Sequence, residues 1–360
     1  MDRRAFLAAL ASLPIWPAGE ARAAAVEFAA VLPGRRLVFP RDHGAHPDFR
    51  HEWWYATGWL TLPDGSPLGF QSTFFRVRSG VGEGNPSAFA PRQLLLAHAA
   101  LADPRLGRLR HDQRVARAGF GRAGFADERT GAWIGDWRFE QDGDRYRATV
   151  RAGDFAYDLT LAPDGPPLAN GVGGFSAKAA DPRHASYYYS RPQLAAGGTV
   201  TIAGRRQAVS GRAWLDHEWS SQPLPEGAQG WDWVGLNLDD GGALMAFRLR
   251  RPDGSPLWAA ATERAPDGGA RNLPAEAVAF EPLRSWRSPR SGIAWPVAWR
   301  LRAGARVFVL WPLFDDQELD SRRTTGAIYW EGAVRVTENG REVGRGYLEM
   351  TGYGERIRLG

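Results

Sequence analysis

The segment EWWYATGWLTLPDGSPL at positions 52–68 decides the fold class of this chain. Its aromatic residues are typical of a strand, and its Asp64-Gly65 pair is the strongest short-range signal for a tight hairpin turn. Successive residues of a strand point to opposite faces, so Trp53 and Trp54 place a large aromatic side chain on each face. The segment therefore predicts an antiparallel hairpin whose first strand, 52–62, is covered on both faces.

The same pattern of strand and turn continues along the chain. Asp-Gly pairs begin at positions 64, 142, 164, 240 and 253, between segments rich in apolar and aromatic residues. Helical periodicity is scarce, and 274–279 is one weak helix candidate. Many short antiparallel strands joined by hairpins indicate a sandwich or barrel, since a parallel sheet would need helices between its strands. We therefore expect an all-β protein.

Two parts of the sequence echo each other. Glu52-Trp53 is followed by DGSPL at 64–68, and Glu218-Trp219 is followed by DGSPL at 253–257. The connector 220–229 contains proline, glycine and serine, which are typical of a loop between structured segments. We therefore expect two related domains, at 36–222 and 223–360.

The first residues have the features of an export signal. Residues 2–7, DRRAFL, have the twin-arginine form, and an apolar stretch and a small-residue cleavage site at 21–23 follow. The apolar stretch is too short, and too broken by proline, for a membrane helix. We therefore expect a signal peptide at 1–23 and a periplasmic or secreted protein, exported by the twin-arginine route and not integral to the membrane.

The composition excludes several function classes. The net charge of +5 comes almost entirely from arginines, and these are scattered along the chain, which argues against nucleic-acid binding. The absence of cysteine excludes disulfides, thiolate metal sites and thiol nucleophiles. The 16 Trp and 17 Phe residues suit a β architecture with a roomy apolar cavity. An apolar small molecule is therefore the expected partner.

Acidic residues stand beside large rings in two places, at Glu52 and at Asp216-His217-Glu218. Burial among rings raises the pKa of a carboxyl and makes it a candidate proton donor near neutral pH. If the strand at 52–62 lies beside that at 207–219, these residues share one site. An alternative stays open, in which the tryptophans are core and each acid pairs with an arginine. For Glu52 that partner would be Arg76, which could otherwise clamp a ligand carboxylate.

These motifs resemble those of a known family. The chain is similar, from Phe39 to Tyr353, to lipocalin-like secreted proteins that include carotenoid 1,2-hydratases and predicted secreted hydrolases, some encoded beside ABC transporters. Further matching pieces are DHGAHP at 42–47, YYYSRP at 187–192 and GYLEMTGY at 346–353. The resemblance implies two tandem lipocalin-like antiparallel β-barrel domains with an isoprenoid or lipid-like ligand. It also raises ABC transporter components as partners.

The resemblance further implies a hydratase chemistry, in which an acid protonates a C=C bond and water traps the carbocation. The catalytic candidates are Glu52, Asp216, His217 and Glu218. The candidates for ligand binding are Trp53, Trp54, Tyr55, Phe74, Arg76, Tyr187, Tyr189, Trp219, Trp231 and Asp232. The His-x-Trp pair of the hydratases maps onto His217 and Trp219. Their Tyr-x-Asp pair has no counterpart, because the corresponding stretch reads Met-Ala-Phe at 245–247.

The sequence also allows other functions to be considered, namely a carrier, a serine hydrolase and a metal site. A non-catalytic carrier of hydrophobic ligands would need the same cavity but no acid. A serine hydrolase is disfavoured because the chain lacks a Gly-x-Ser-x-Gly elbow. A zinc or iron site could draw on Asp42, His43, His46 and His51, with His217 nearby. A hydrogen-bonded loop explains these residues as well, and we expect neither a metal nor a cofactor.

Overall fold

The structure, a computed structural model, describes residues 26–222 and 224–357. The predicted signal peptide, 1–23, lies outside these residues. In the described part the chain forms strands and three short 3-10 helices, η1 (Arg41–His43), η2 (Pro104–Leu106) and η3 (Ala275–Ala277). The weak helix candidate at 274–279 is reduced to η3. None of the described helices has the length and apolar character needed to cross a membrane. The predicted all-β class is confirmed.

The first sheet is built from residues 51–220. Its strands are β1 (His51–Thr61), β2 (Pro67–Arg78), β3 (Gln93–Ala102), β4 (Arg110–Arg117), β5 (Ala123–Phe125), β6 (Gly131–Ile134), β7 (Trp137–Asp142), β8 (Arg145–Arg151), β9 (Phe155–Ala162), β10 (Leu168–Ala169), β11 (Phe175–Ala177), β12 (Ala185–Ile202) and β13 (Arg205–Ser220). The main path runs β4-β3-β2-β1-β13-β12-β9-β8-β7-β6-β5, and β10 and β11 add to β12. Since β4 and β5 at the two ends touch, the sheet nearly closes into a barrel.

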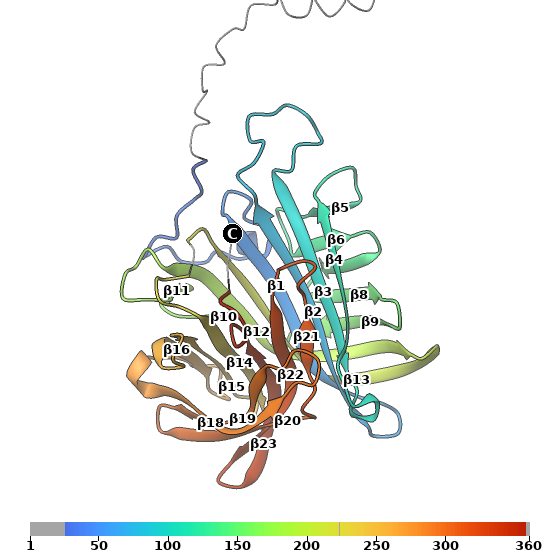
Figure 1. The fold of residues 1–360 in the computed structure, drawn as a ribbon, viewed down its shortest axis with the longest axis vertical. Coiled ribbons are helices and arrows are strands. Elements are labelled where there is room, and N and C mark those ends of the chain that lie inside the picture. The colour runs from blue at the N-terminus through green and yellow to red at the C-terminus, as the bar shows by residue number, and fades with distance from the viewer. Residues whose placement is uncertain (1–25, 223, 358–360) are drawn as a thin grey trace, which may run out of the picture.

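The second sheet follows the connector. Its strands are β14 (Gly230–Leu238), β15 (Ala243–Arg250), β16 (Pro256–Arg264), β17 (Ala270–Leu273), β18 (Val278–Arg287), β19 (Ala294–Ala303), β20 (Arg306–Pro312), β21 (Glu318–Asp320), β22 (Ile328–Glu338) and β23 (Arg341–Met350). Their order is β17-β16-β15-β14-β23-β22-β20-β19-β18, with β21 on β22. Every strand pair in both sheets is antiparallel, as expected for tandem lipocalin-like sheets. Figure 1 shows this sheet in orange and red below the first.

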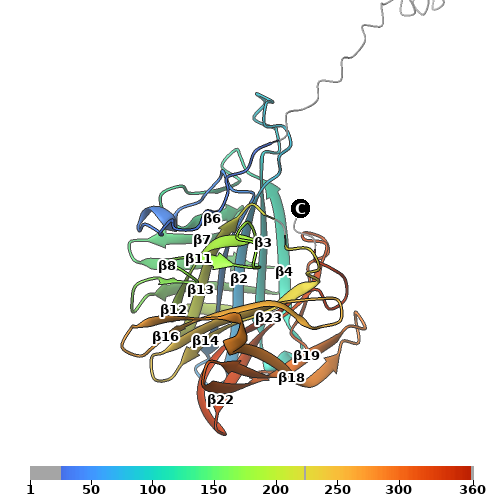
Figure 2. The same cartoon turned by 90° about the vertical axis from the view of Figure 1, so that its left-hand side faces the viewer.

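The two sheets pack against each other through the middle of the first. Strand β1 contacts β23, and β12 and β13 contact β14. The turned view of Figure 2 shows β14 and β16 crossing the lower part of the first sheet. Tyr55 and Trp214 from the first sheet meet Trp233, Phe247 and others from the second in one apolar cluster. Trp54, on the opposite face of β1, lies in the core of the first barrel. The prediction that this strand is covered on both faces is confirmed.

Candidate active site

Strand β1 lies beside β13, which meets the condition for a shared site, but the two strands divide the acidic residues between two faces. Tyr55 is paired with Asp216, and Trp54 with His217. Directly paired residues of an antiparallel sheet share a face, and successive residues alternate. Asp216 and Glu218 therefore face the second sheet, while Glu52 and His217 face the interior of the first barrel. The pleat thus directs the side chains of the expected single site to opposite faces of the sheet, while Glu52 itself still borders the cavity, described below, that Asp216 and Glu218 line.

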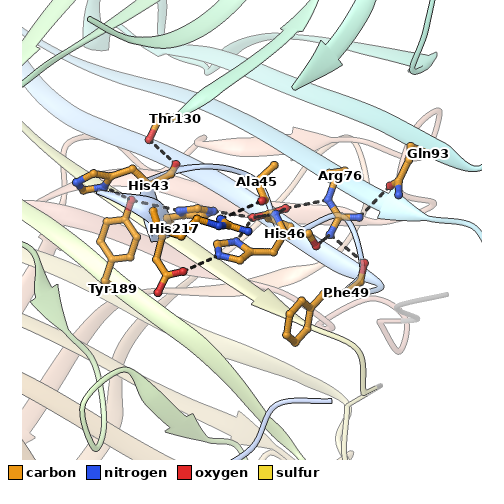
Figure 3. A network of polar contacts seen from close by, with 12 residues as sticks. His43, Ala45, His46, Phe49, Arg76, Gln93, Thr130, Tyr189 and His217 are labelled. Carbon is orange, nitrogen blue, oxygen red and sulfur yellow. Dashed lines mark hydrogen bonds and ion pairs between the residues drawn. The ribbon is translucent and has the colours of Figure 1, made fainter. Parts of the chain in front are cut away.

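Glu52 lies at the centre of the inner group, and Figure 3 labels its partners His46, Arg76 and His217. Its Oε1 accepts hydrogen bonds from His46 Nδ1 and His217 Nε2, each 2.8 Å long, and its Oε2 accepts one from Arg76 Nε, also 2.8 Å long. Burial alone would raise the pKa of Glu52, but the Arg76 charge and the two histidine bonds hold that pKa well below its ordinary range. The expectation that burial makes Glu52 a proton donor is therefore wrong.

Arg76 is committed to this network. Besides Glu52, its guanidinium donates to Gln93 Oε1 and to the carbonyl oxygens of His46 and Phe49, each at 2.9 Å. Each of its three nitrogens is thus engaged, and the side chain is fully buried. A ligand carboxylate would have to displace these bonds. The predicted ligand clamp at Arg76 is wrong, and the alternative internal Arg–Glu pair is what the structure contains.

Aromatic rings enclose the inner group. Trp219 stacks on His46 with ring centroids 3.7 Å apart, and Trp54 stacks on His217 at 4.9 Å. Tyr189 places its hydroxyl 3.0 Å from His43 Nδ1 and 3.2 Å from His217 Nδ1. These rings support the polar network from within the barrel.

The remaining predicted ligand residues are also structural. The Tyr187 hydroxyl bonds the backbone of Leu32, and Phe74 lies in the barrel core. Asp232 accepts hydrogen bonds from Arg248 Nε and the Tyr353 hydroxyl, at 2.7 and 2.9 Å. The structure therefore corrects six ligand-binding predictions, because these side chains pack away from the cavity described below: Trp54, Phe74, Tyr187, Tyr189, Trp219 and Asp232.

Within the described residues, His46, Glu52 and His217 form one group with the spacing of metal ligands, their ligand atoms lying within 4.8 Å of one another. Asp42, another residue considered as a metal ligand, accepts a hydrogen bond from His46 and is not part of this group. His51 stands apart, and burial lowers its pKa to about 4. Since Arg76 already supplies a positive charge to Glu52, the group is satisfied by hydrogen bonds and we assign it a structural role.

The outer group lines a cavity of about 390 Å³ between the two sheets. Its aromatic walls include Trp53, Tyr55, Phe75, Tyr188, Trp231, Trp233 and Phe247. Four acidic residues reach this cavity away from the Glu52 network: Asp216, Glu218, Glu331 and Glu349. An aromatic cavity with a few converging polar groups is the usual form of a small-molecule site.

Asp216 is the acid whose surroundings suit proton transfer. Its carboxylate accepts hydrogen bonds from the Tyr188 hydroxyl, Ser190 Oγ and Trp214 Nε1, at 2.7, 2.6 and 2.7 Å. All three donors are neutral, so none of them stabilises the buried, ionised carboxylate as strongly as a cation would. Burial therefore dominates and raises the pKa of Asp216 to about 7. Near neutral pH this carboxyl can both donate and accept a proton.

Glu218 has a different role, because it is paired with a cation. Lys178 Nζ lies 2.9 Å from its Oε1, and Ser186 Oγ donates to the same oxygen. The lysine also lies over the rings of Phe247 and Tyr188, at 4.2 and 5.2 Å from their centroids. Glu218 therefore anchors the only lysine of the sequence inside the cavity.

Sequence reasoning missed the acid pair on the opposite wall. Glu331 of β22 is paired directly with Glu349 of β23. Burial raises the pKa of Glu349 to about 7, and burial and the charge of Glu349 raise that of Glu331 well above its ordinary range. Neither acid was given a functional role by the sequence alone. Both stand in strand segments rich in aromatic residues, a signal that marked Glu52 and Glu218 elsewhere.

A second cavity, of about 310 Å³, lies at the other end of β1 and has a more polar lining. It includes the charged side chains of Asp164, Arg212 and Arg345. Arg212 lies 3.8 Å from Asp164, so two of these charges offset each other. The acids with raised pKa values line the first cavity, which is therefore the candidate active site.

Comparison with known proteins identifies the family. A family model described as AttH-like matches residues 30–353. The chain belongs to the AttH-like family. A crystal structure of a protein assigned to AttH from Nitrosomonas europaea is 49% identical, with a TM-score of 0.85, and the match covers 91% of this AttH-like chain and 100% of that one. No curated protein matches the chain.

More distant structures share the fold of this AttH-like protein. Kievitone hydratase from Nectria haematococca is 15% identical, with a TM-score of 0.68, over 91% of this chain and 96% of that one. CghA, crystallised with Sch210972, is 16% identical, with a TM-score of 0.50, over 84% of this chain and 89% of that one. These similarities confirm the predicted lipocalin-like fold. At such identities they establish the fold alone.

Proposed function

We propose that this AttH-like protein binds an apolar, isoprenoid or lipid-like molecule between its two sheets and adds water to a C=C bond by acid catalysis. One observation carries the proposal: Asp216, a buried carboxyl with a pKa of about 7, faces a cavity walled by aromatic rings. The shared fold of kievitone hydratase, a hydratase by name, supports the same reaction class. We further propose that the protein acts after export.

The chemistry follows from the cavity walls. The Asp216 carboxyl donates its proton to one alkene carbon, and the π electrons form the new C–H bond. The positive charge left on the other carbon is stabilised by aromatic faces such as Trp53 and Trp231. Water then attacks this carbon, and its released proton passes to a cavity carboxylate, for which Glu349 suits because its pKa is also about 7. The net change is the addition of one water molecule, and no cofactor is consumed.

A non-catalytic carrier is the second candidate, and one observation favours it. The stretch at 245–247 lacks the Tyr and Asp of the hydratases, and its Met245 and Phe247 belong to the apolar cluster between the sheets. A carrier would hold the ligand against these side chains and deliver it unchanged, for example to an ABC transporter. It would use the same cavity, so the two candidates differ in turnover and not in binding.

The deciding experiment offers the purified protein acyclic isoprenoids that carry a terminal trisubstituted C=C bond. Binding is followed by tryptophan fluorescence, and products are analysed by mass spectrometry in H₂¹⁸O and in D₂O. A hydratase should place one ¹⁸O and one non-exchangeable deuterium on adjacent carbons. Binding without product would support the carrier instead. Absence of both binding and product would refute the cavity as a site for this ligand class.

The rate of water addition should depend on pH in a defined direction. Asp216 must be protonated to act, so the rate should fall as pH rises through about 7. Well above that value the fall should approach about tenfold per pH unit. The test is a profile of kcat from pH 5 to pH 9, with circular dichroism to confirm folding at each point. A rate that stays constant or increases above pH 7 would exclude Asp216 as the proton donor.

A further inference from the structure

The Glu331–Glu349 pair, like Asp216, has no cationic partner, in contrast to two other buried acids. Glu52 has Arg76, and Glu218 has Lys178. In the described part of the chain, no lysine or arginine forms an ion pair with Glu331 or Glu349. Two like charges directly opposite each other in a sheet are destabilising. Burial therefore favours the protonated forms of the pair, and in the described protein no cation is present that would stabilise both carboxylates together.

Polar atoms beside the pair are also without partners. Glu331 Oε2 and the Tyr55 hydroxyl are buried and make no hydrogen bond among the described residues. Glu349 is held on one side, where Trp231 Nε1 donates to its Oε1 at 2.7 Å. All four side chains line the cavity between the sheets. Buried polar groups are normally satisfied, so these point to a ligand group that completes them.

Elsewhere in the cavity, a lysine shows how a cation can pair with a buried acid. The Lys178 ammonium on the opposite wall forms an ion pair with Glu218 and lies over the rings of Phe247 and Tyr188. Rings and carboxylates together are how proteins recognise organic ammonium groups. Around Glu331 and Glu349 the same ingredients are present, in the rings of Tyr55 and Trp231, but the cation is not supplied by the protein.

We propose that the Glu331–Glu349 pair, with Tyr55 and Trp231, is a subsite for the positively charged ammonium group of an apolar organic amine. This inference rests on the proposed ligand cavity and names the ligand charge that it selects. An ammonium group there would offset both carboxylates and face two rings. The same subsite would favour the carbocation of the proposed hydration, which also carries a single positive charge.

Binding of such a cation should strengthen as pH rises. The titratable and charged groups that face the pair are Asp216 and Glu218 from β13, Tyr55 from β1, Tyr329 from β22, Tyr347 from β23, Lys178 before β12 and Tyr188 within β12. Lys178 is already paired with Glu218, and the tyrosines stay neutral because burial raises their pKa values. The carboxyls of Asp216 and Glu349 lose their protons near pH 7, so the cavity becomes more negative between pH 6 and pH 8.

The experiment compares two ligands of the same shape. 3-Phenylpropylammonium and butylbenzene differ in having a positively charged NH₃⁺ group, which can also donate hydrogen bonds, or a neutral methyl group at the same position. Calorimetry with the whole protein at pH 7.5 should show binding of the cation about tenfold tighter than that of the neutral isostere. The preference should shrink at pH 5.5. Buffers of different ionisation enthalpy should reveal proton release when the cation binds.

Substitutions test whether the preference for the cation over the neutral isostere depends on Glu331 and Glu349. Glu349→Gln and Glu331→Gln should each abolish most of it, and both should fold, because glutamine resembles the protonated acid that burial favours. Glu342→Gln, at an exposed position of β23, is the matched control and should leave the preference unchanged. The proposal is overturned if wild type binds the isostere equally well, if it binds neither ligand, or if both cavity variants keep the preference. Hydration activity is measured separately, so its absence alongside cation selectivity would refute only the catalytic proposal.

Discussion

Asp216→Asn should reduce the rate of water addition by about 100-fold or more, since general acid catalysis contributes factors of this size. Asparagine keeps the shape of the side chain, and its amide oxygen can still accept hydrogen bonds from Ser190 and Trp214, while its NH2 group faces the Tyr188 hydroxyl oxygen. It has no acidic proton to give. Ligand affinity should stay within about twofold of wild type, because the apolar walls supply most of the binding. The measurement is kcat together with a fluorescence Kd for the same isoprenoid.

Asp239→Asn provides the matched control for this substitution. Asp239 is exposed just after β14 and does not line the active-site cavity. The control should keep both the rate and the affinity of wild type. A normal rate in the Asp216 variant would show that the proton comes from another carboxyl, and the corresponding variant of Glu349 would then be measured.

Arg76→Met should lower the free energy of unfolding by about 3–5 kcal/mol, the range found when one member of a buried ion pair is removed. The methionine fills part of the space but leaves the Glu52 carboxylate without its charged partner. It also removes the donors to two backbone carbonyls, those of His46 and Phe49. Urea denaturation at pH 7 measures the loss. A cost below about 1 kcal/mol would show that the inner network is not essential to the fold.

Two further variants separate the effect of losing the buried Arg76 charge from other effects of the substitution. Arg78→Met is the control on the same strand, because Arg78 forms a more exposed pair with Glu83 and should cost about 1 kcal/mol or less. The double variant with Glu52→Gln should recover part of the loss, since no unpaired carboxylate remains. The pKa of Glu52 in the folded state lies below its ordinary value of 4.5. Its contribution to stability is thus present above about pH 4.5 and is lost as pH falls further, so the cost of Arg76→Met should shrink in acid.

Much of the fold could be predicted because the signals for it are local. Asp-Gly turns and alternating apolar residues specify hairpins within a few positions of each other, and the predicted strand at 52–62 is shifted by only one residue from β1. The pairing of β1 with β13 was only a possibility at that stage, and it lies in the middle of the sheet, whereas the barrel closes between β4 and β5. The three-residue β5 and the two-residue β10 were missed, since such short strands depend on pairing with neighbours. The longer β4 and β18 were also missed, because these edge strands bury few residues and so lack a clear apolar alternation.

The candidate site could be predicted only in part. Asp216, Glu218, Trp53, Tyr55 and Trp231 are found at the cavity, whereas His217 faces away from it. Glu331 and Glu349 were missed because they follow Asp216 by more than 100 positions in the sequence. They reach the same cavity only because the second sheet packs on the first, which no local pattern reports.

The sequence by itself determined that this chain is an all-β protein of the lipocalin-like type, with acids set among tryptophans. Tertiary structure decided what those acids can do. Glu52 and Asp216 look alike in the sequence, each an acid close to aromatic residues, and both are buried. Glu52 meets a guanidinium and two imidazoles from distant segments and has a lowered pKa, whereas Asp216 meets only neutral donors and has a raised one. The sign of such a shift depends on charges that folding brings near, because burial penalises every carboxylate and only a nearby cation can offset it.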